Sequence, residues 1–336
     1  MTSKSTILLG GVLVAVLQTS IADARPILKI NGAVETEFNT AEGYGGEKET
    51  EIVLATVEVA IDAKINDQVD THILLLYEEG EGDAPVMDEG TVNFSLGNNS
   101  SIALGKLYLP FGTFETNLVS DPLTLELGET GEVALMYNFS SAGFDSSLYV
   151  FNGDSDTDAT LADGNNTDLA YGLSLGYNME ESFMINLGYL SNIADSDSLQ
   201  SLTDTNMTDF VAGIAFSTGF AFSSVSINLE YIAALDEFQT GDLGGDVPAG
   251  AKPSTTLVDL GIDIGGGFSI GAGYHGSSDA AFLGLPESVT ALALGYEFAE
   301  DTSLAFEYAT ANDYAIADGG TGESASQILF LLAAEF

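Results

Sequence analysis

Carboxylate side chains recur at alternate positions of several apolar segments. In each segment one alternating set is large and apolar, and the other consists of Gly, Ala, Ser, Asn and acids. The acids predicted to line a pore are Glu58, Asp62, Glu230, Asp259, Asp263, Glu297 and Glu307. Carboxylates that share one surface attract cations and repel anions. The first chemistry that this pattern predicts is therefore the handling of positively charged solutes.

A second set of candidate residues lies in GKLYLPFGTFETNLVSDPLTLELGET, residues 105–130. This stretch is too long for a hairpin turn and too apolar for a solvated loop, and Pro110 and Pro122 interrupt it. The residues predicted to contact a ligand or to narrow a pore are Lys106, Tyr108, Phe111, Phe114, Glu115, Asp121, Glu126 and Glu129. Lys106 is the best candidate for contact with an anion, although the alternation slips around it and leaves its facing open.

A third candidate is the acidic stretch NGDSDTDATLADGNNTD, residues 152–168. Asp154, Asp156, Asp158 and Asp163 offer oxygen ligands that suit Ca²⁺ or Mg²⁺, either within the loop or as a bridge to lipopolysaccharide phosphates. The closing Glu of an EF-hand is missing, so an ordinary acidic surface loop is the simpler alternative. No other cofactor is expected.

Catalysis is not expected from this chain. His72 lies within a predicted strand and His275 at the end of another, and neither belongs to a recognisable catalytic motif. The run GGGFSIGAG is predicted to be a turn and a strand with small inward residues. It is not predicted to be a phosphate loop, because no helix follows it. We therefore do not expect an enzyme.

The composition excludes further classes. The formal net charge of −44 argues against nucleic-acid binding, and the absence of cysteine excludes disulfides. Solvation of long loops is the simplest reading of this charge. Yet 45% of the residues are hydrophobic and the mean hydropathy is +0.20, so the chain is too apolar for a disordered acidic protein. A surface that faces lipid would explain both properties.

The N-terminal residues 1–24 are predicted to be a cleaved secretory signal peptide. MTSK is a short basic region, STILLGGVLVAVLQTS is an apolar core, and Ala22-Asp23-Ala24 fits the cleavage pattern. The alternative is a transmembrane helix, but the apolar run is short for one. The mature chain is then 25–336, predicted to form one transmembrane β-barrel.

The elements that must position the candidate residues are strands, because the hydrophobic period is two nearly everywhere. A soluble sandwich also alternates, but it would not leave carboxylates opposite its apolar face so regularly. Aromatic residues gather at strand ends, as in the two girdles of an outer-membrane barrel. One predicted girdle holds Tyr177, Phe216, Tyr296 and Phe298, and the other holds Tyr189, Tyr231, Tyr274 and Tyr308.

The chain divides into sixteen predicted antiparallel strands. They lie near 27–38, 50–63, 68–79, 88–97, 101–109, 131–139, 143–152, 167–178, 182–192, 207–217, 221–235, 255–264, 267–276, 287–298, 301–311 and 326–336. Short and long connections alternate, which is typical of periplasmic turns and extracellular loops. The short ones include IND, GNNS, SSAG, NMEE, TGF, GGG and AEDT. The predicted fold is therefore an all-β outer-membrane barrel of a Gram-negative bacterium.

The third long loop, 110–130, is predicted to fold inward and narrow the pore. Leu118, Leu123, Leu125 and Leu127 would pack on the inner wall, while Glu115, Asp121, Glu126 and Glu129 face the water path. The alternative is an ordinary loop that lies over the mouth of the barrel.

The same stretch resembles the LbtU family of siderophore porins, the receptors for legiobactin-type siderophores. PFG at 110–112, FETN at 114–117, SDPLTLELGET at 120–130 and YVFNGD at 149–154 carry the resemblance. It implies a sixteen-stranded barrel that admits a ferric siderophore without a plug domain. The position of the first predicted strand, almost at the mature terminus, also leaves no room for a plug. An acidic lumen would nevertheless repel an anionic ferric polycarboxylate.

Three functional hypotheses follow from the sequence. The first is a porin or receptor for a ferric siderophore, the second a cation-selective general or nutrient channel, and the third a structural or adhesive barrel. The expected partners are outer-membrane lipid, lipopolysaccharide, the barrel-assembly machinery through the terminal Phe336, and further copies of the chain in a homotrimer.

Overall fold

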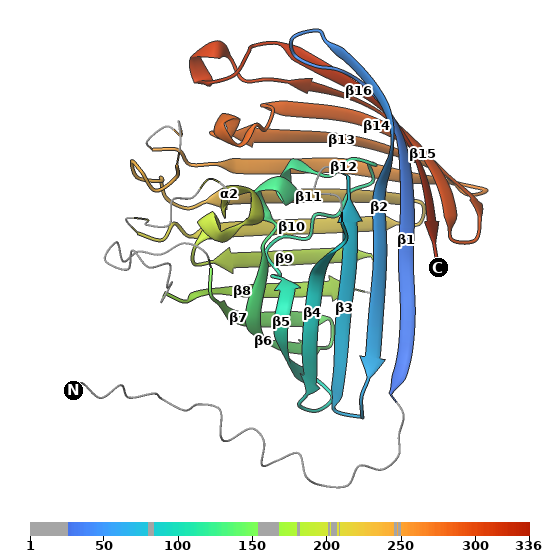
Figure 1. Ribbon diagram of the computed structural model, residues 1–336, viewed down its shortest axis with the longest axis vertical. Helices are drawn as coiled ribbons and strands as arrows, with labels where there is room; N and C mark the ends of the chain where they lie inside the picture. Colours follow the sequence, from blue (N-terminus) through green and yellow to red (C-terminus); the bar gives the residue numbers. More distant parts are fainter. Residues whose placement is uncertain are drawn as a thin grey trace.

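The computed structural model describes residues 26–79, 84–153, 168–179, 182–200, 202, 207, 209–244, 247 and 250–336. Sixteen antiparallel strands form a closed barrel in which each strand pairs with its neighbours in sequence and β1 pairs with β16 (Figure 1). The predicted fold class and strand number are thus confirmed. The signal peptide, 1–24, and the four aspartates Asp154, Asp156, Asp158 and Asp163 lie outside the described residues.

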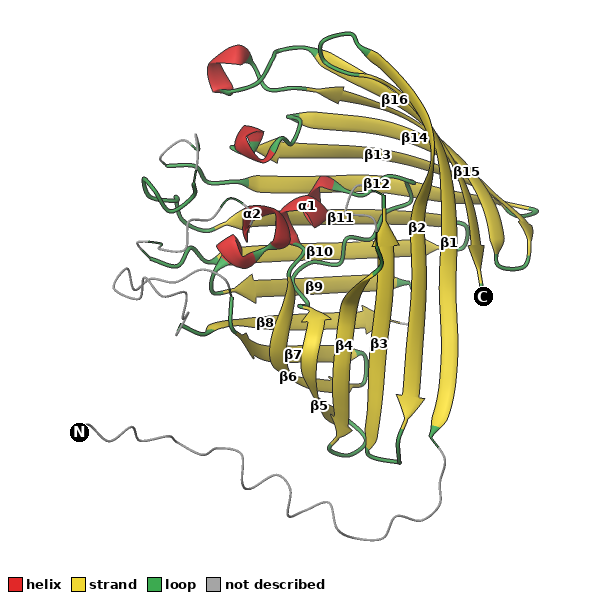
Figure 2. Ribbon diagram, in the orientation of Figure 1, coloured by secondary structure: helices red, strands yellow, loops and turns green. Residues whose placement is uncertain are grey.

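The strands have the following bounds. They are β1 Ile27–Glu42, β2 Lys48–Lys64, β3 Val69–Glu78, β4 Val86–Ser95, β5 Ser100–Tyr108, β6 Gly131–Ser141, β7 Phe144–Phe151, β8 Ala170–Met179, β9 Phe183–Leu190, β10 Gly213–Phe222, β11 Val225–Ala234, β12 Ser254–Gly265, β13 Phe268–Ser278, β14 Ser288–Ala299, β15 Thr302–Asn312 and β16 Ser324–Glu335. Short helices occur only between strands in the described residues: α1 Leu123–Gly128, η1 Ile193–Asp195, α2 Asp197–Gln200, η2 Ala281–Leu283 and η3 Ile316–Asp318 (Figure 2).

One predicted strand and its turn are wrong. The tenth strand was placed at 207–217 with a turn at TGF, 218–220, but β10 spans 213–222 and the chain turns at Ser223 and Ser224. Ser223 takes the left-handed conformation with φ 57°, which the sequence does not signal because glycine normally marks such a position. Gly219 lies inside the strand instead. The first long connection is also shorter than predicted, since β1 and β2 extend to Glu42 and Lys48.

Large apolar side chains cover the outside of the barrel. Examples are Leu104, Leu148, Leu173, Leu292 and Phe330, which are 37–58% exposed although they are apolar. A surface of this kind is stable only against lipid. Among the described residues, no helix combines the length and hydropathy that a membrane-spanning helix requires.

Aromatic contacts mark the end of the barrel that carries the short turns. The rings of Phe144 and Tyr177 are 4.6 Å apart between centroids, and those of Phe268 and Tyr296 are 4.2 Å apart. The prediction that Phe216 and Tyr177 share one girdle is wrong. Phe216 pairs with Tyr231, which was assigned to the other girdle, across β10 and β11. The displaced boundary of β10 explains this error.

The barrel closes where its last residue meets its first strand. The backbone N–H of Phe336 donates to the carbonyl of Gly32, and the N–H of Gly32 donates back to Phe336, both at 3.0 Å. The ring of Phe336 lies over Gly32, where any Cβ would collide with it. Phe336 is therefore part of the β1–β16 seam.

Candidate functional site: a narrowed lumen

The connection between β5 and β6 folds into the barrel. Its helix α1 lies against β11, β12 and β13, far along the sequence from its own strands (Figure 2). Three carboxylates on the inner wall receive backbone N–H groups of this segment. We name residues 109–130 the inner loop and these carboxylates the tether acids: Glu230 on β11, Asp259 on β12 and Glu307 on β15.

The first tether acid fixes the start of the inner loop. The N–H of Thr113 donates to Glu230 Oε1 at 2.6 Å, and the N–H of Phe114 donates to Oε2 at 3.2 Å. The hydroxyl of Ser217 on β10 adds a further bond to Oε1 at 2.6 Å. Hydrogen bonds to an ionised acceptor are the stronger kind, so this contact orders the loop as well as satisfying the carboxylate.

The second tether acid fixes the middle of the inner loop. Asp259 accepts the Thr116 hydroxyl at 2.8 Å and the Asn117 side-chain amide at 2.7 Å, as well as the Asn117 backbone N–H. The side-chain amide of Asn228 on β11 donates to the same carboxylate at 3.1 Å. Asp259 is 1% exposed, so these donors take the place of water.

The third tether acid holds the segment that follows. Glu307 accepts the N–H of Val119 at 2.6 Å and both the N–H and the hydroxyl of Ser120. Within the described residues, the tether acids form no ion pair with Lys or Arg. Their charges are therefore balanced by the dipoles of the inner loop.

Small residues on the inner wall allow the inner loop to approach closely. A Cβ at Gly271 would collide with the backbone carbonyl of Asn117, and one at Gly261 would collide with the Asn117 side chain. Leu118 lies next to Gly273 in the same way. The Gly-rich face that the sequence shows on these strands is therefore a seat for the loop.

The structure corrects the predicted pore lining at the tether acids. Glu230, Asp259 and Glu307 are on the inner wall as predicted, but they are 3%, 1% and 2% exposed, because the inner loop covers them. The other predicted pore-lining acids, Glu58, Asp62, Asp263 and Glu297, stay partly or fully exposed. Asp62 accepts a hydrogen bond from His72 Nδ1 at 2.8 Å.

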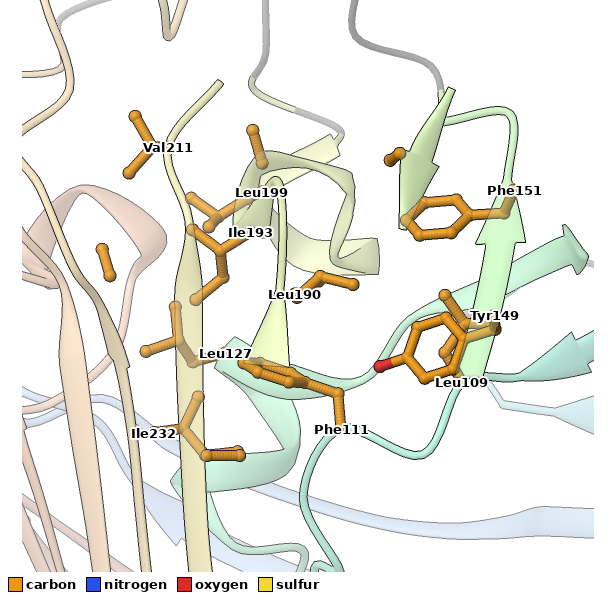
Figure 3. Packing of buried hydrophobic residues seen from close by; sticks show 14 of the residues in the cluster. Leu109, Phe111, Leu127, Tyr149, Phe151, Leu190, Ile193, Leu199, Val211 and Ile232 are labelled. Carbon is orange, nitrogen blue, oxygen red and sulfur yellow. The ribbon is translucent and has the colours of Figure 1, made fainter. Parts of the chain in front are cut away.

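The aromatic residues of the inner loop pack in a hydrophobic cluster inside the barrel. Phe111 is fully buried, and Phe114 packs against the same hydrophobic cluster. Figure 3 shows Phe111 among Leu127, Leu190 and Ile232. This cluster fills one side of the lumen, so Phe111 narrows the passage from within the cluster and does not itself contact a solute. The predicted role of the partly buried Phe114 stays a prediction.

A second inward segment was missed from the sequence. The connection between β9 and β10, described at 191–200, 202, 207 and 209–212, brings Ile193, Leu199 and Val211 into the cluster (Figure 3). The N–H of Asp197 in α2 donates to the carbonyl of Glu129, and the Asp197 carboxylate accepts the N–H of Gly131, each at 2.9 Å. The apolar residues of this connection are irregularly spaced among polar ones, so no periodic pattern signalled its burial.

The acids of the inner loop differ in their exposure. Glu115, Asp121 and Glu126 are exposed and Glu129 is half-buried, while Leu123 and Leu127 are buried on the wall side. Loss of water raises the pKa of Asp121, with Glu307 adding to the effect, and raises the pKa of Glu126, with Asp121 adding to it. For Glu129, burial and the nearby Asp197 raise the pKa to about 7.

More acids stand on the wall that faces the inner loop. Glu37 on β1 lies within electrostatic range of Asp121, Glu35 and Glu51. Glu78 on β3 is likewise within range of Glu129. The narrowed passage is therefore bordered by carboxylates on both of its sides, and sequence reasoning had not singled out Glu35, Glu37, Glu51 or Glu78.

Basic groups do not balance these acids in the described residues. Lys48 pairs with Glu42 at 3.0 Å and Lys64 with Asp67 at 3.1 Å, away from the inner loop. Lys106 acts on Asp197, where it opposes the effect of burial on the pKa of that carboxyl. Asp88, which also acts on Asp197, accepts a hydrogen bond from the Tyr108 hydroxyl at 2.9 Å. Lys106 is thus surrounded by carboxylates, which weakens it as a contact for anions.

The slip in alternation near Lys106 has a backbone cause. Gly105 has φ 144°, and a Cβ there would collide with the carbonyl of Gly90. Only glycine fits this position, although β5 keeps its register with β4 and β6 there.

No group of three or more His, Cys, Asp or Glu side chains is placed to hold a metal ion in the described residues.

The sequence of this chain is similar to a small set of known proteins. No family model matches the chain. It is 23% identical over 330 residues to a UPF0422 protein of Legionella pneumophila (strain Lens), an alignment that covers 88% of this chain. It is 25% identical over 301 residues to a UPF0422 protein of Coxiella burnetii, an alignment that covers 84% of this chain. The aligned parts are 61% and 64% of those relatives, so the chain spans less than two thirds of their length.

Solved structures share the architecture. An anion-selective porin from Comamonas acidovorans has a TM-score of 0.67 at 14% identity, covering 93% of this chain and all of that one. The outer membrane channel DcaP of Acinetobacter baumannii also has a TM-score of 0.67 at 14% identity, covering 94% and 99%. The trimer form of OmpT from Vibrio cholerae has a TM-score of 0.59 at 14% identity, covering 93% and 100%.

The fold is that of the sixteen-stranded outer-membrane porins. Together with the apolar outer surface, this fold supports the predicted location in the outer membrane of a Gram-negative bacterium. The resemblance to the LbtU family is not decided by these relatives.

Proposed function

We propose that this barrel is a cation-selective diffusion channel for small, positively charged solutes. The observation that carries the proposal is the pair of acidic borders: Asp121, Glu126 and Glu129 on the inner loop, and Glu35, Glu37 and Glu78 on the facing strands. Like charges on both sides add their potentials along the path of the solute.

The fold alone carries no information on selectivity. The Comamonas porin has a similar fold and is described as anion-selective. The sign of the preferred ion must therefore come from the side chains of the narrowed passage. In this chain, these are carboxylates, and each one favours a passing monovalent cation by about 0.5–1 kcal/mol in a water-filled lumen.

A second candidate function is the passage of a ferric siderophore for iron uptake. It is favoured by the resemblance of 110–130 and 149–154 to siderophore porins. The acidic borders oppose it, because an anionic ferric polycarboxylate would be repelled from both sides. A cargo of this kind would need bound cations to screen the wall, or a siderophore that is neutral or cationic when it holds iron.

One experiment separates the two candidates. Proteoliposomes with the refolded barrel are exposed to solutes of similar size that carry a positive charge, no charge or a negative charge, and their swelling rates are compared. Faster entry of the cation supports the first candidate. In parallel, a ferric polycarboxylate siderophore is added at micromolar concentration to single channels. Saturable block of the current would support the second, while equal entry of all three solutes would contradict the first.

We also propose that the barrel forms a homotrimer in contact with lipopolysaccharide, and that Phe336 serves recognition by the barrel-assembly machinery. Support for the trimer comes from OmpT of Vibrio cholerae, which has a similar fold and is described in a trimer form. The mass of the complex after mild detergent extraction tests this proposal: a monomer under conditions that preserve a known trimeric porin would contradict it.

A further inference from the structure

A cavity of about 690 Å³ opens among the long loops, apart from the inner loop's acidic border. Its lining comes from four connections that precede β10, β12, β14 and β16. Because long loops gather at one end of a porin barrel, the cavity lies in the outer vestibule. Its volume is in the range of sites that hold small molecules. We name it the vestibule pocket.

The walls of the vestibule pocket combine apolar and acidic side chains. The apolar part includes Leu202, Val247, Ala281 and Phe282, and the acids are Asp279, Glu287 and Asp318. Lys and Arg are absent from its described lining, and the three acids form no ion pair with a described Lys or Arg. A cavity whose lining combines apolar side chains with three carboxylates and no described Lys or Arg matches a ligand that has an apolar body and one positive charge.

Hydrogen bonds fix the shape of these walls. The Tyr314 hydroxyl, which is buried in the lining, lies 2.5 Å from the Ser277 hydroxyl, and the Ser277 hydroxyl also donates to the carbonyl of Pro286 at 2.6 Å. The N–H of Gly244 donates to the carbonyl of Leu202 at 2.6 Å, which joins two of the loops. A preformed cavity avoids the entropic cost of ordering loops around a ligand.

Aromatic rings stand close to the acids. The carboxylates of Asp279 and Glu287 lie within electrostatic range of Tyr314 and add to the rise that burial causes in its pKa. Phe282 is a second ring in the lining. An ammonium group gains from carboxylates and from the faces of aromatic rings together.

The vestibule pocket shares structure with the inner loop. Leu123 of α1 packs in a small cluster with Ala280 and Leu285, which lie in the connection that also supplies Asp279, Ala281 and Phe282 to the pocket. A solute in this pocket is therefore held next to the element that narrows the passage.

From these observations we propose that the vestibule pocket binds small organic cations with a compact apolar body, such as aryl- or alkylammonium ions, before they enter the narrowed lumen. The delivery of bound solute to the passage rests on the cation channel proposed above. Binding itself depends on the cavity, its acids and its rings.

The test uses the full refolded barrel in detergent micelles. Binding of phenethylammonium is measured by ligand-observed nuclear magnetic resonance, with 2-phenylethanol as a neutral probe of similar shape and empty micelles as the blank. The ammonium should bind at least about threefold more tightly than the alcohol, because only the ammonium is attracted by the acids of the lining. Equal affinities would overturn the proposal.

Variants locate the site. Asp279→Asn, Glu287→Gln and Asp318→Asn together should weaken ammonium binding about tenfold, and Phe282→Ala should weaken both probes. The matched control is Asp209→Asn, Asp236→Asn and Glu237→Gln, three acids that line a separate cavity of about 530 Å³. The control should bind like wild type. A vestibule variant that binds like wild type, or a control that loses as much affinity, would contradict the assignment.

The outcome is separable from that of the proposed function. Selectivity for K⁺ over Cl⁻ is measured without any organic probe. A cation-selective barrel that fails to bind phenethylammonium would refute only the vestibule pocket, and a barrel that binds it without cation selectivity would refute only the proposed channel.

Discussion

The inner wall has two regions that carry the same residue type and use it differently. Under the inner loop, Glu230, Asp259 and Glu307 are buried and accept hydrogen bonds from the loop. On the strands across the passage, acids such as Glu37 and Glu58 remain partly exposed to the lumen. The first region uses charge to hold a segment of the chain, and the second leaves its charge to act on solutes.

This difference shows why the number of carboxylates on a barrel wall overstates its field. A carboxylate covered by protein donors has its charge balanced locally, whereas one in contact with water acts along the whole path. The selectivity proposed for this channel therefore depends on the exposed acids, and the shape of its passage depends on the buried ones. Mutations in the two regions should separate these effects.

The largest effect on stability is expected at Phe111→Ala, within the inner loop. Phe111 is fully buried in the lumen cluster, so its truncation should lower the free energy of unfolding by about 3–5 kcal/mol. The measurement is urea denaturation in micelles, followed by circular dichroism. Phe216→Ala on the lipid-facing surface is the control and should cost less. Similar losses at the two sites would show that the cluster inside the lumen does not stabilise the barrel.

The next effect is expected at Asp259→Ala. This change leaves the Asn117 N–H and the Thr116 hydroxyl without their acceptor, and should weaken docking of the inner loop by about 2–4 kcal/mol. The released loop should give noisier single-channel currents and faster proteolysis within 113–120. Asp263→Ala, on the same inner face but exposed, is the matched control and should leave both properties unchanged. Quiet currents in both variants would mean that the tether does not hold the loop.

A pH effect is expected from Glu129, which lies on the inner loop and borders the passage. The pKa of Glu129 is raised to about 7, so this group loses its charge as the pH falls through neutrality, before an ordinary carboxyl would. Cation preference should therefore decrease between pH 8 and pH 6, and Glu129→Gln should remove that step. The folded state also binds this proton more tightly than the unfolded chain, so the group favours folding progressively as the pH falls from above 7 toward 4.5.

Reversal potentials at a series of pH values test this prediction. A preference that stays constant from pH 8 to pH 6 in the wild type would mean that Glu129 does not act on the permeating ion. A step that persists in Glu129→Gln would assign the titration to another group.

The smallest effect is expected from Glu126→Gln. Glu126 is exposed on α1, so its neutralisation should reduce the preference for K⁺ over Cl⁻ only about two- to fivefold, with no change in stability. Glu300→Gln, in the turn after β14, is a control of equal charge. An equal change in both variants would indicate a general effect of net charge.

The sequence predicted the architecture because the alternation of large and small residues repeats in every strand. It failed at β10, where Ser223 turns the chain without glycine and Gly219 stays within the strand. The inward course of the inner loop could be predicted from its apolar and Pro-broken composition. Its contacts could not, because the wall acids and the loop donors are more than a hundred residues apart.

The same limit applies to the predicted site residues. Alternation places Glu230 and Glu58 on one face equally, and only the position of the inner loop decides which of them meets water. Phe111 lies in the unusual segment 105–130, which predicts contact with a ligand or a narrowing of the pore. Its burial involves Ile193 and Leu199 of the connection between β9 and β10, whose inward course the sequence pattern did not suggest.

The most direct test of the proposed channel is the reversal potential of the refolded barrel in a planar bilayer under a tenfold KCl gradient at pH 8. With acids on both borders of the passage, the potential should have the sign of K⁺ selectivity, and it should move toward zero when Asp121, Glu126 and Glu129 are neutralised together. A potential of the opposite sign, or one that the triple variant leaves unchanged, would contradict the account of the acidic passage.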